Sequence, residues 1–219
     1  MISPVPASGH ALPRGARFIT VEGIDGAGKS SHIAAIAEQL QAHGAKVVVT
    51  REPGGTAVGE AIRGLFLGHG MTPDTEALVF AARREHLERV VWPSLARGEW
   101  VVCDRFTDAT VAYQGYGRGL GAARVDALAQ WVHPGFAPGL TFLFDLAPEV
   151  ARLRVTGRTA LDRIEAEAQG FHERVREGYL ARAATEPNRF CVLDATLPIE
   201  VLREMIARRL DRHRAEVGA

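Results

Sequence analysis

The sequence GIDGAGKS, residues 23–30, directly follows the apolar run FITVE at residues 18–22. It matches the pattern G-x-x-x-x-G-K-[ST], in which glycines let the main chain wrap around phosphate with its N–H groups pointing inward. The dipole of a helix that follows such a loop also favours negative charge. Lys29 can reach the outer phosphates, and the Ser30 hydroxyl can bind Mg²⁺. Between a predicted strand and a predicted helix, this motif indicates a site for a nucleoside triphosphate.

Five short, nearly continuous apolar runs are spaced along the chain, with helical patterns between them. Such runs are typical of strands buried on both faces of a parallel sheet and joined by helical crossovers. The pattern therefore predicts an α/β fold of the P-loop NTPase type, with a five-stranded parallel sheet and helices on both faces. The runs are FITVEG (18–23), KVVVTRE (46–52), WVVCDR (100–105), LTFLFDL (140–146) and RFCVLDA (189–195).

Two helical patterns have recognisable ends. SSHIAAIAEQLQAHG should end at Gly44, because glycine is a favoured C-cap. The long run from Thr75 to Arg97 should break near Pro93. In sheets of this kind ligands bind beyond the carboxyl ends of the strands, and four of the five apolar runs end there in charged residues.

The composition indicates one soluble domain. The chain has 219 residues, 47% of them hydrophobic and 24% charged, with a net charge of zero. No global field therefore favours nucleic acid or an anionic membrane, and no apolar stretch reaches the ~18 residues of a membrane span. We expect a cytosolic protein with a flexible N-terminal tail (1–16), one domain (17–213) and a C-terminal tail (214–219). Cys103 and Cys191 are expected to be buried, reduced thiols, and the scattered histidines predict no imidazole metal site.

Asp104 ends the apolar run WVVCDR. A carboxylate at a strand end beside a phosphate loop can hold Mg²⁺ directly or through water. A strand that ends in aspartate is common, and such a residue can also be a polar cap at the surface. Next to a complete phosphate loop, we predict that Asp104 and Ser30 form the metal site.

Two classes of nucleotide-binding protein are disfavoured because their sequence features are missing. The sequence has no NKxD guanine-reading motif, and it is too short for a translocating ATPase with accessory domains. A kinase that acts on a small acceptor remains. From Phe18 to about Leu210 the sequence resembles the thymidylate kinase family, in the stretches VEGIDGAGKS, TREPGGT, LVFAARREH, CDRFTDATVAYQGYGRG and LDRIE. The resemblance implies transfer of a phosphoryl group from ATP to dTMP, Mg²⁺ as cofactor, and a homodimer.

The stretch TREPGGT follows the second predicted strand. Arg51 could meet an acceptor phosphate, while the Pro-Gly-Gly turn brings the main chain close to a ligand. In LVFAARREH, Phe80 and Arg84 lie one helical turn apart, so a ring that stacks on a nucleobase would lie beside a donor for its edge. The resemblance implies that Phe80 stacks on thymine and that Arg84 donates to its ring carbonyl.

The stretch DRFTDATVAYQGYGRG carries further acceptor contacts by resemblance. Arg105 is expected to grip the dTMP phosphate, and Asp25 in the phosphate loop to engage the 3′-hydroxyl. Tyr113 corresponds to a residue that crowds the sugar 2′ position. Thr110 and Gln114 correspond to positions at the thymine edge. Ala109 departs from the hydroxyl-bearing residue usual in the family, so we assign it no contact.

An arginine-rich segment, residues 152–165, is expected to form a short lid. Phosphoryl transfer spreads negative charge over the moving oxygens, and an arginine delivered on closure can stabilise it. Members of the family carry this basic group either in the phosphate loop or in the lid. Gly26 occupies the loop position here, so the resemblance assigns the group to the lid. Arg158 is the first candidate; Arg154 and Arg163 are alternatives, and Glu165 could contact the metal or substrate.

These inferences define three sets of residues. The predicted catalytic residues are Asp25, Lys29, Arg105 and Arg158. The predicted ATP contacts are Gly23, Gly26, Ala27, Gly28, Lys29, Ser30, Ser31, Arg154 and Asp194. The predicted acceptor contacts are Asp25, Arg51, Glu52, Pro53, Phe80, Arg84, Arg105, Thr110, Tyr113 and Gln114. Two other functions stay open at this point: another small-molecule P-loop kinase, and a non-enzymatic nucleotide sensor.

Overall fold

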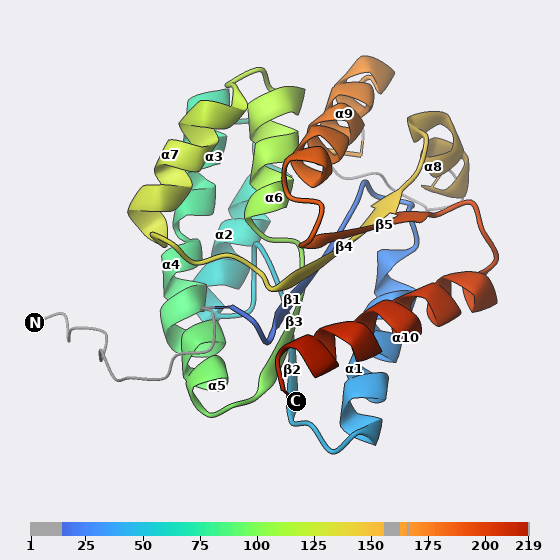
Figure 1. Ribbon diagram of the computed structural model, residues 1–219. Helices are drawn as coiled ribbons and strands as arrows, with labels where there is room; N and C mark the ends of the chain where they lie inside the picture. Colours follow the sequence, from blue (N-terminus) through green and yellow to red (C-terminus); the bar gives the residue numbers. More distant parts are fainter. Residues whose placement is uncertain (1–14, 156–162, 166, 219) are drawn as a thin grey trace, which may run out of the picture.

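A parallel sheet forms the centre of the protein. The computed structural model describes residues 15–155, 163–165 and 167–218 (Figure 1). The strands are β1 (Phe18–Glu22), β2 (Val47–Arg51), β3 (Trp100–Asp104), β4 (Leu140–Asp145) and β5 (Phe190–Asp194). They pair in parallel in the order β2-β3-β1-β4-β5. The predicted α/β fold with a five-stranded parallel sheet is confirmed.

Helices connect the strands. Along the chain they are α1 (Lys29–Ala42), α2 (Ala57–Gly68), α3 (Pro73–Ala81), α4 (Arg83–His86), α5 (Trp92–Ala96), α6 (Thr107–Thr110), α7 (Ala122–Val132), α8 (Pro148–Val155), α9 (Gln169–Thr185) and α10 (Ile199–Glu216), with wider π-helical turns η1 (Leu87–Val91) and η2 (Val111–Gly117). Helix α1 ends near Gly44 as predicted: this glycine has a φ of 82° and donates its N–H to the Gln41 carbonyl.

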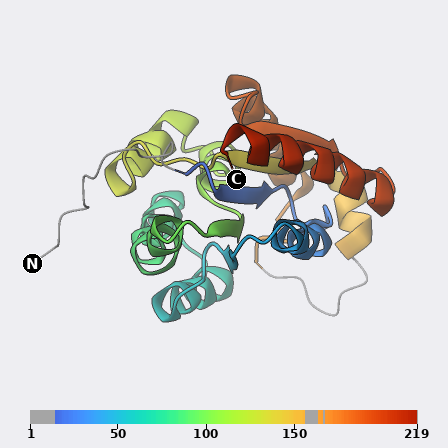
Figure 2. The same ribbon diagram turned by 60° about the horizontal axis from the view of Figure 1, so that its bottom comes forward.

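Both faces of the sheet are covered. Figure 1 shows α1 and α10 side by side against the strands, and Figure 2 places the cyan and green helices α2 to α5 across the strands from α10. Side chains alternate accordingly along β3. Trp100 and Val102 join the apolar cluster that contains α1 residues, whereas Val101 and Cys103 join the cluster that contains η1 residues. The edge strands are less covered, since Val49 in β2 is 52% exposed.

The helical run after Thr75 is broken differently from the prediction. Helix α3 ends at Ala81, α4 begins at Arg83, and η1 follows directly. The chain then continues through Pro93 in the first turn of α5. Proline lacks an N–H, and its ring crowds the preceding turn, so the wide turn of η1 just before it accommodates the ring without ending the helix. The break near Pro93 is therefore a change of helical pitch, and the sharper break lies at Ala82.

The fold extends beyond the predicted domain boundaries at both ends. Ala16 is buried, and its carbonyl accepts a hydrogen bond of 2.7 Å from His213 Nε2. Gly15 accepts main-chain hydrogen bonds from Phe18 and Gly139. At the other end α10 continues to Glu216. Among the helices within the described ranges, none is long and apolar enough to cross a membrane.

Candidate active site

The phosphate loop joins the carboxyl end of β1 to α1. Gly23, Gly26 and Gly28 all have positive φ, which only glycine adopts readily. At Gly23 a side chain is also excluded by space, since a Cβ atom would lie 2.5 Å from the Phe144 carbonyl oxygen. The predicted ATP contacts from Gly23 to Ser31 thus lie together on this loop and the first turn of the helix.

Lys29 is folded back onto its own loop. Its Nζ donates to the carbonyls of Gly23 (2.9 Å) and Ile24 (3.0 Å) and lies 3.7 Å from Asp25 Oδ1. Burial, with a smaller contribution from Arg105, lowers the pKa of Lys29 to about 8. A phosphate anion that replaced the two carbonyls would favour the charged amine. The loop therefore holds its cation in place before any ligand binds.

Asp104 stands at the end of β3, level with Val21 of β1. Its Oδ1 is buried and, within the part of the chain that the structure describes, accepts no hydrogen bond. A buried carboxylate oxygen without a donor is costly unless a cation or water satisfies it. Mg²⁺ prefers such oxygens, and the exposed Ser30 lies in the first turn of α1 beside the loop. The Asp104 carboxylate and the Ser30 hydroxyl are thus oxygen donors of the kind that Mg²⁺ prefers.

A cavity opens beside the phosphate loop. Its walls come from the loops that follow β1, β2 and β3 and from α2, α3, α4, α6 and η2. It is lined by Asp25, Glu52, Pro53, Arg63, Phe66, Leu67, Phe80, Arg83, Arg105, Phe106, Ala109, Thr110, Tyr113, Gln114 and Ile164. Eight of the ten predicted acceptor contacts are in this set; Arg51 and Arg84 are not. Phe80 packs edge-to-face on Phe66 with ring centroids 4.8 Å apart.

Arg105 lies where the cavity meets the phosphate loop. It has a φ of 69°, a left-handed conformation that is uncommon for a residue with a side chain. Its Nη2 donates to Asp25 Oδ1 (2.6 Å), and its guanidinium lies over the Tyr113 ring, 5.0 Å from the centroid. Although burial opposes ionisation, Arg105 and Lys29 hold the pKa of Asp25 well below its usual range. The Asp25 carboxylate thus contacts both Lys29 of the phosphate loop and Arg105 of the cavity.

The structure places the Arg84 side chain outside the cavity. This side chain donates to the Val132 carbonyl (2.7 Å) and to Glu88 (2.6 Å), away from the cavity. The neighbouring Arg83 lines the cavity instead and donates to the hydroxyls of Thr107 and Thr110. The break at Ala82 is the physical reason, because the regular rotation that puts residues i and i+4 on one face does not carry across it.

Arg51 is likewise not brought to the cavity. Its guanidinium makes two hydrogen bonds to the Glu60 carboxylate, at 2.7 and 3.2 Å, and its side chain is 51% exposed. Glu60 also accepts from the Gly55 N–H, so the pair fastens the glycine turn onto α2. Another arginine, Arg63 on helix α2, lines the cavity instead and donates to the Pro53 carbonyl.

Glu52 anchors the cavity floor. Its side chain is 3% exposed, and it pairs with His86 Nδ1 (2.8 Å) and with Arg83 Nε (3.3 Å). His86 in turn shares a hydrogen bond of 2.7 Å with the Thr50 hydroxyl. The predicted contact Glu52 therefore lines the cavity itself and also holds Arg83, a second lining residue.

Gln114 has a fixed amide orientation. Its Nε2 donates to Glu76 Oε2 (3.1 Å), and a carboxylate only accepts hydrogen bonds. The amide oxygen is buried and has no partner among the described residues. Arg118 and Arg163 also donate to Glu76, which is fully buried. The Gln114 side chain therefore presents to the cavity an amide oxygen that can accept a hydrogen bond from a ligand.

The structure describes only part of the predicted lid, residues 152–165. Arg158 lies outside the described residues. Arg154 donates to the Ala195 carbonyl (3.0 Å), and Arg163 donates to Glu76 (2.8 Å) and the Phe66 carbonyl (3.1 Å). Asp194, the predicted ATP contact at the end of β5, accepts from the N–H and hydroxyl of Thr196 and so caps a turn.

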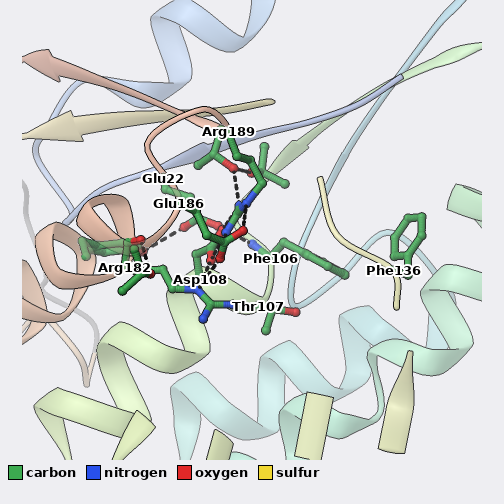
Figure 3. Close-up of polar contacts among 12 residues, drawn as sticks. Glu22, Phe106, Thr107, Asp108, Phe136, Arg182, Glu186 and Arg189 are labelled. Atoms are coloured by element: carbon green, nitrogen blue, oxygen red, sulfur yellow. Dashed lines mark hydrogen bonds and ion pairs between the residues drawn. The ribbon is translucent and has the colours of Figure 1, made fainter. Parts of the chain in front are cut away.

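Behind the cavity lies a buried charged cluster (Figure 3). Asp108 is 1% exposed and accepts from Arg189 (2.6 Å) and Arg182 (3.1 Å). Burial opposes the charge of Asp108, but Arg189 and Arg182 lower its pKa. Burial, and then the nearby Asp108, raise the pKa of Glu22 to about 8. The cluster ties α9 and β5 to the segment that carries Arg105.

Several of these residues escaped the sequence reasoning. Arg63 and Phe66 lie on an amphipathic helix whose orientation only the folded structure gives. Glu22 was visible as a charged strand end but had no assigned role. Tyr179, whose hydroxyl accepts a hydrogen bond of 3.0 Å from Arg105 Nη1, carries no motif and is brought to the site by the packing of α9.

A phosphate loop at the carboxyl edge of a parallel sheet, opening into a cavity with its own arginines, defines the class: a P-loop kinase with a second, acceptor-binding pocket. A family model described as thymidylate kinase matches residues 21–206. The thymidylate kinase of Thiobacillus denitrificans is 54% identical over 195 residues, covering 89% of this chain and 96% of that protein. The enzyme of Bordetella petrii is 53% identical over 195 residues, covering 89% and 94%.

A solved structure of a thymidylate kinase is also similar to this chain. The crystal structure of thymidylate kinase from Ehrlichia chaffeensis aligns with a TM-score of 0.72 and 36% identity, covering 89% of this chain and 97% of that one. The chain belongs to the thymidylate kinase family and is therefore an enzyme of the nucleoside-monophosphate kinase class.

Proposed function

We propose that the protein transfers the γ-phosphoryl group of ATP to the phosphate of dTMP in the presence of Mg²⁺, giving ADP and dTDP. The observation that carries this proposal is the Asp25 bridge: Asp25 lies between Lys29 of the phosphate loop and Arg105 of the cavity. A donor on one side and an acceptor on the other would meet at this carboxylate.

Catalysis would consist of positioning and charge neutralisation. The acceptor phosphate is already ionised at neutral pH, so its oxygen can attack the γ-phosphorus in line without a strong general base. The loop N–H groups and Lys29 would bind the ATP phosphates, and Arg105 would orient the acceptor phosphate. Mg²⁺, held by Asp104 and Ser30, would neutralise charge on the donor phosphates. Of the lid residues, Arg158 remains our candidate for stabilising the transferred group.

The pocket chemistry supports a pyrimidine base with a ring N–H, such as thymine. Phe80 offers an aromatic face for stacking, and Arg83 supplies a cation at the same wall. Gln114 presents only an amide oxygen, which can accept from the ring N3–H of thymine or uracil. The ring N3 of cytosine carries no hydrogen, so it cannot donate to that buried oxygen.

Two further properties concern assembly and cellular location. We propose a homodimer, since Leu78 of α3 and Trp131 of α7 are large apolar side chains that are 64% and 78% exposed. We also propose a cytosolic enzyme, in keeping with the free thiols of Cys103 and Cys191.

The test is ADP release by purified protein with ATP and Mg²⁺, against dTMP, dUMP, dCMP, dGMP, dAMP and UMP separately. Strong preference for dTMP is the expected result. Preference for another monophosphate would keep the kinase and refute the thymine pocket. Absence of acceptor-dependent ADP from folded, ATP-binding protein would refute the proposed reaction.

A further inference from the structure

Arg105 has an unusual main-chain conformation that is held by neighbouring groups. Its left-handed φ of 69° is unfavourable for a residue with a Cβ atom. Its N–H donates to the Val21 carbonyl (3.1 Å), and its carbonyl accepts from the Cys103 thiol (3.1 Å). The next N–H, that of Phe106, donates to Glu22 Oε1 at 2.7 Å. The main chain on both sides of Arg105 is thus tied to β1.

The side chain of Arg105 is held by a second route that ends on the same carboxyl group of Glu22. Its Nη1 donates to the Tyr179 hydroxyl (3.0 Å), and that hydroxyl donates to Glu22 Oε2 (2.9 Å). Tyr179 is 1% exposed and Glu22 is fully buried. The two oxygens of Glu22 therefore fix the peptide that follows Arg105 and, through Tyr179, the end of its guanidinium.

We infer that Glu22 and Tyr179 are positioning residues that hold the Arg105 guanidinium in the orientation needed for the acceptor phosphate. The inference rests on the proposed role of Arg105 in binding that phosphate. Glu22 and Tyr179 are both buried, and neither is among the residues that line the cavity. Their contribution is therefore indirect and passes through Arg105.

Orientation matters because Arg105 has a competing partner. Its Nη2 is bound to Asp25, which pulls the guanidinium toward the phosphate loop. Tyr179 holds the other terminal nitrogen and so prevents rotation about the Asp25 contact. Without the hydroxyl the planar group keeps one anchor, and a bidentate contact to phosphate becomes less well aligned. Binding of the acceptor should suffer more than binding of ATP.

The test variant is Tyr179→Phe, which removes the hydroxyl and keeps the buried ring. The matched control is Tyr116→Phe. The Tyr116 ring packs against Gly178, the neighbour of Tyr179, and it does not line the cavity. For each protein we would measure kcat and KM with dTMP varied and with ATP varied, the affinity for dTMP alone by calorimetry, and the unfolding temperature.

For Tyr179→Phe we expect kcat/KM for dTMP and the dTMP affinity to fall by roughly tenfold, the effect of losing one hydrogen bond to a charged group. KM for ATP should stay within about twofold, and Tyr116→Phe should match the wild type in all readouts. Unchanged dTMP parameters in folded Tyr179→Phe, or equal losses for ATP and dTMP, would overturn the inference. If the wild type itself neither binds nor phosphorylates dTMP, the proposed function fails instead, independently of the variant.

Discussion

Arg83 and Arg84 are adjacent arginines whose replacement by alanine should have very different effects. The Arg83 side chain is 6% exposed and pairs with Glu52, which is 3% exposed. Arg83→Ala removes the guanidinium from that buried carboxylate, which keeps its hydrogen bond with His86. Breaking a buried pair by removing one member costs about 3–5 kcal/mol. At about 2–4 °C per kcal/mol for a domain of this size, the unfolding temperature should fall by roughly 6–20 °C.

Arg84→Ala removes much less. The side chain is 39% exposed and forms a surface pair with Glu88, worth about 0.3–0.5 kcal/mol. Its hydrogen bond to the Val132 carbonyl adds about 1 kcal/mol. The expected decrease in unfolding temperature is therefore about 3–6 °C.

Activity should separate the two variants further. Arg83 lines the cavity, so its loss should lower kcat/KM for dTMP by about 10- to 100-fold, the range for a hydrogen bond to a charged donor. Arg84→Ala should stay within about threefold, because it leaves the cavity wall intact. The assays are thermal unfolding and steady-state ADP release with dTMP varied, below the unfolding temperature of both variants. A larger loss of dTMP activity in Arg84→Ala than in Arg83→Ala would refute this reasoning.

Lys29→Ala should lower kcat by about 100- to 1000-fold with unchanged circular dichroism, because it removes the cation that faces the donor phosphates. Near-normal turnover would contradict the phosphate-loop assignment. Asp104→Asn should raise the Mg²⁺ concentration needed for half-maximal rate by about tenfold or more. Even residues that only hydrogen-bond to a metal ligand change metal affinity by that much when they are replaced. In the folded protein the pKa of Glu22 is about 8, above its ordinary value of 4.5, so the folded state binds the Glu22 proton more tightly than the unfolded state does. The contribution of Glu22 to the free energy of unfolding therefore falls as the pH rises from about 4.5 to about 8. Glu22→Gln should remove that decrease, which urea unfolding at pH values of about 6 and about 8 would detect; an unchanged slope would show that other groups cause it.

Sequence reasoning was most successful where local pattern determines structure. Short apolar runs predicted every strand of the sheet to within one residue at each end, since buried parallel strands have few alternatives. The phosphate loop was equally clear, because its glycines and Lys29 act through main-chain geometry that the motif itself specifies.

Sequence reasoning failed where a side chain's direction depends on irregular helix geometry or on distant packing. The choice between Arg83 and Arg84 turns on the break at Ala82, which the propensities of an alanine-rich stretch do not reveal. Arg51 pairs with Glu60, nine residues further along the chain, on a helix whose orientation the local sequence does not set. Tyr179 reaches Glu22 across 157 positions, and such contacts have no local signal.

The strand order has a consequence for how the enzyme becomes active during its synthesis. The phosphate loop leaves the ribosome early, yet its strand β1 pairs only with β3 and β4, which are made later. Tyr179, on α9, comes later still. Contacts between segments so far apart form slowly and leave strand edges open meanwhile. A nascent chain that stops before α9 would carry the whole nucleotide motif and still lack the tyrosine that holds Arg105, so protein truncated there should not turn over dTMP efficiently.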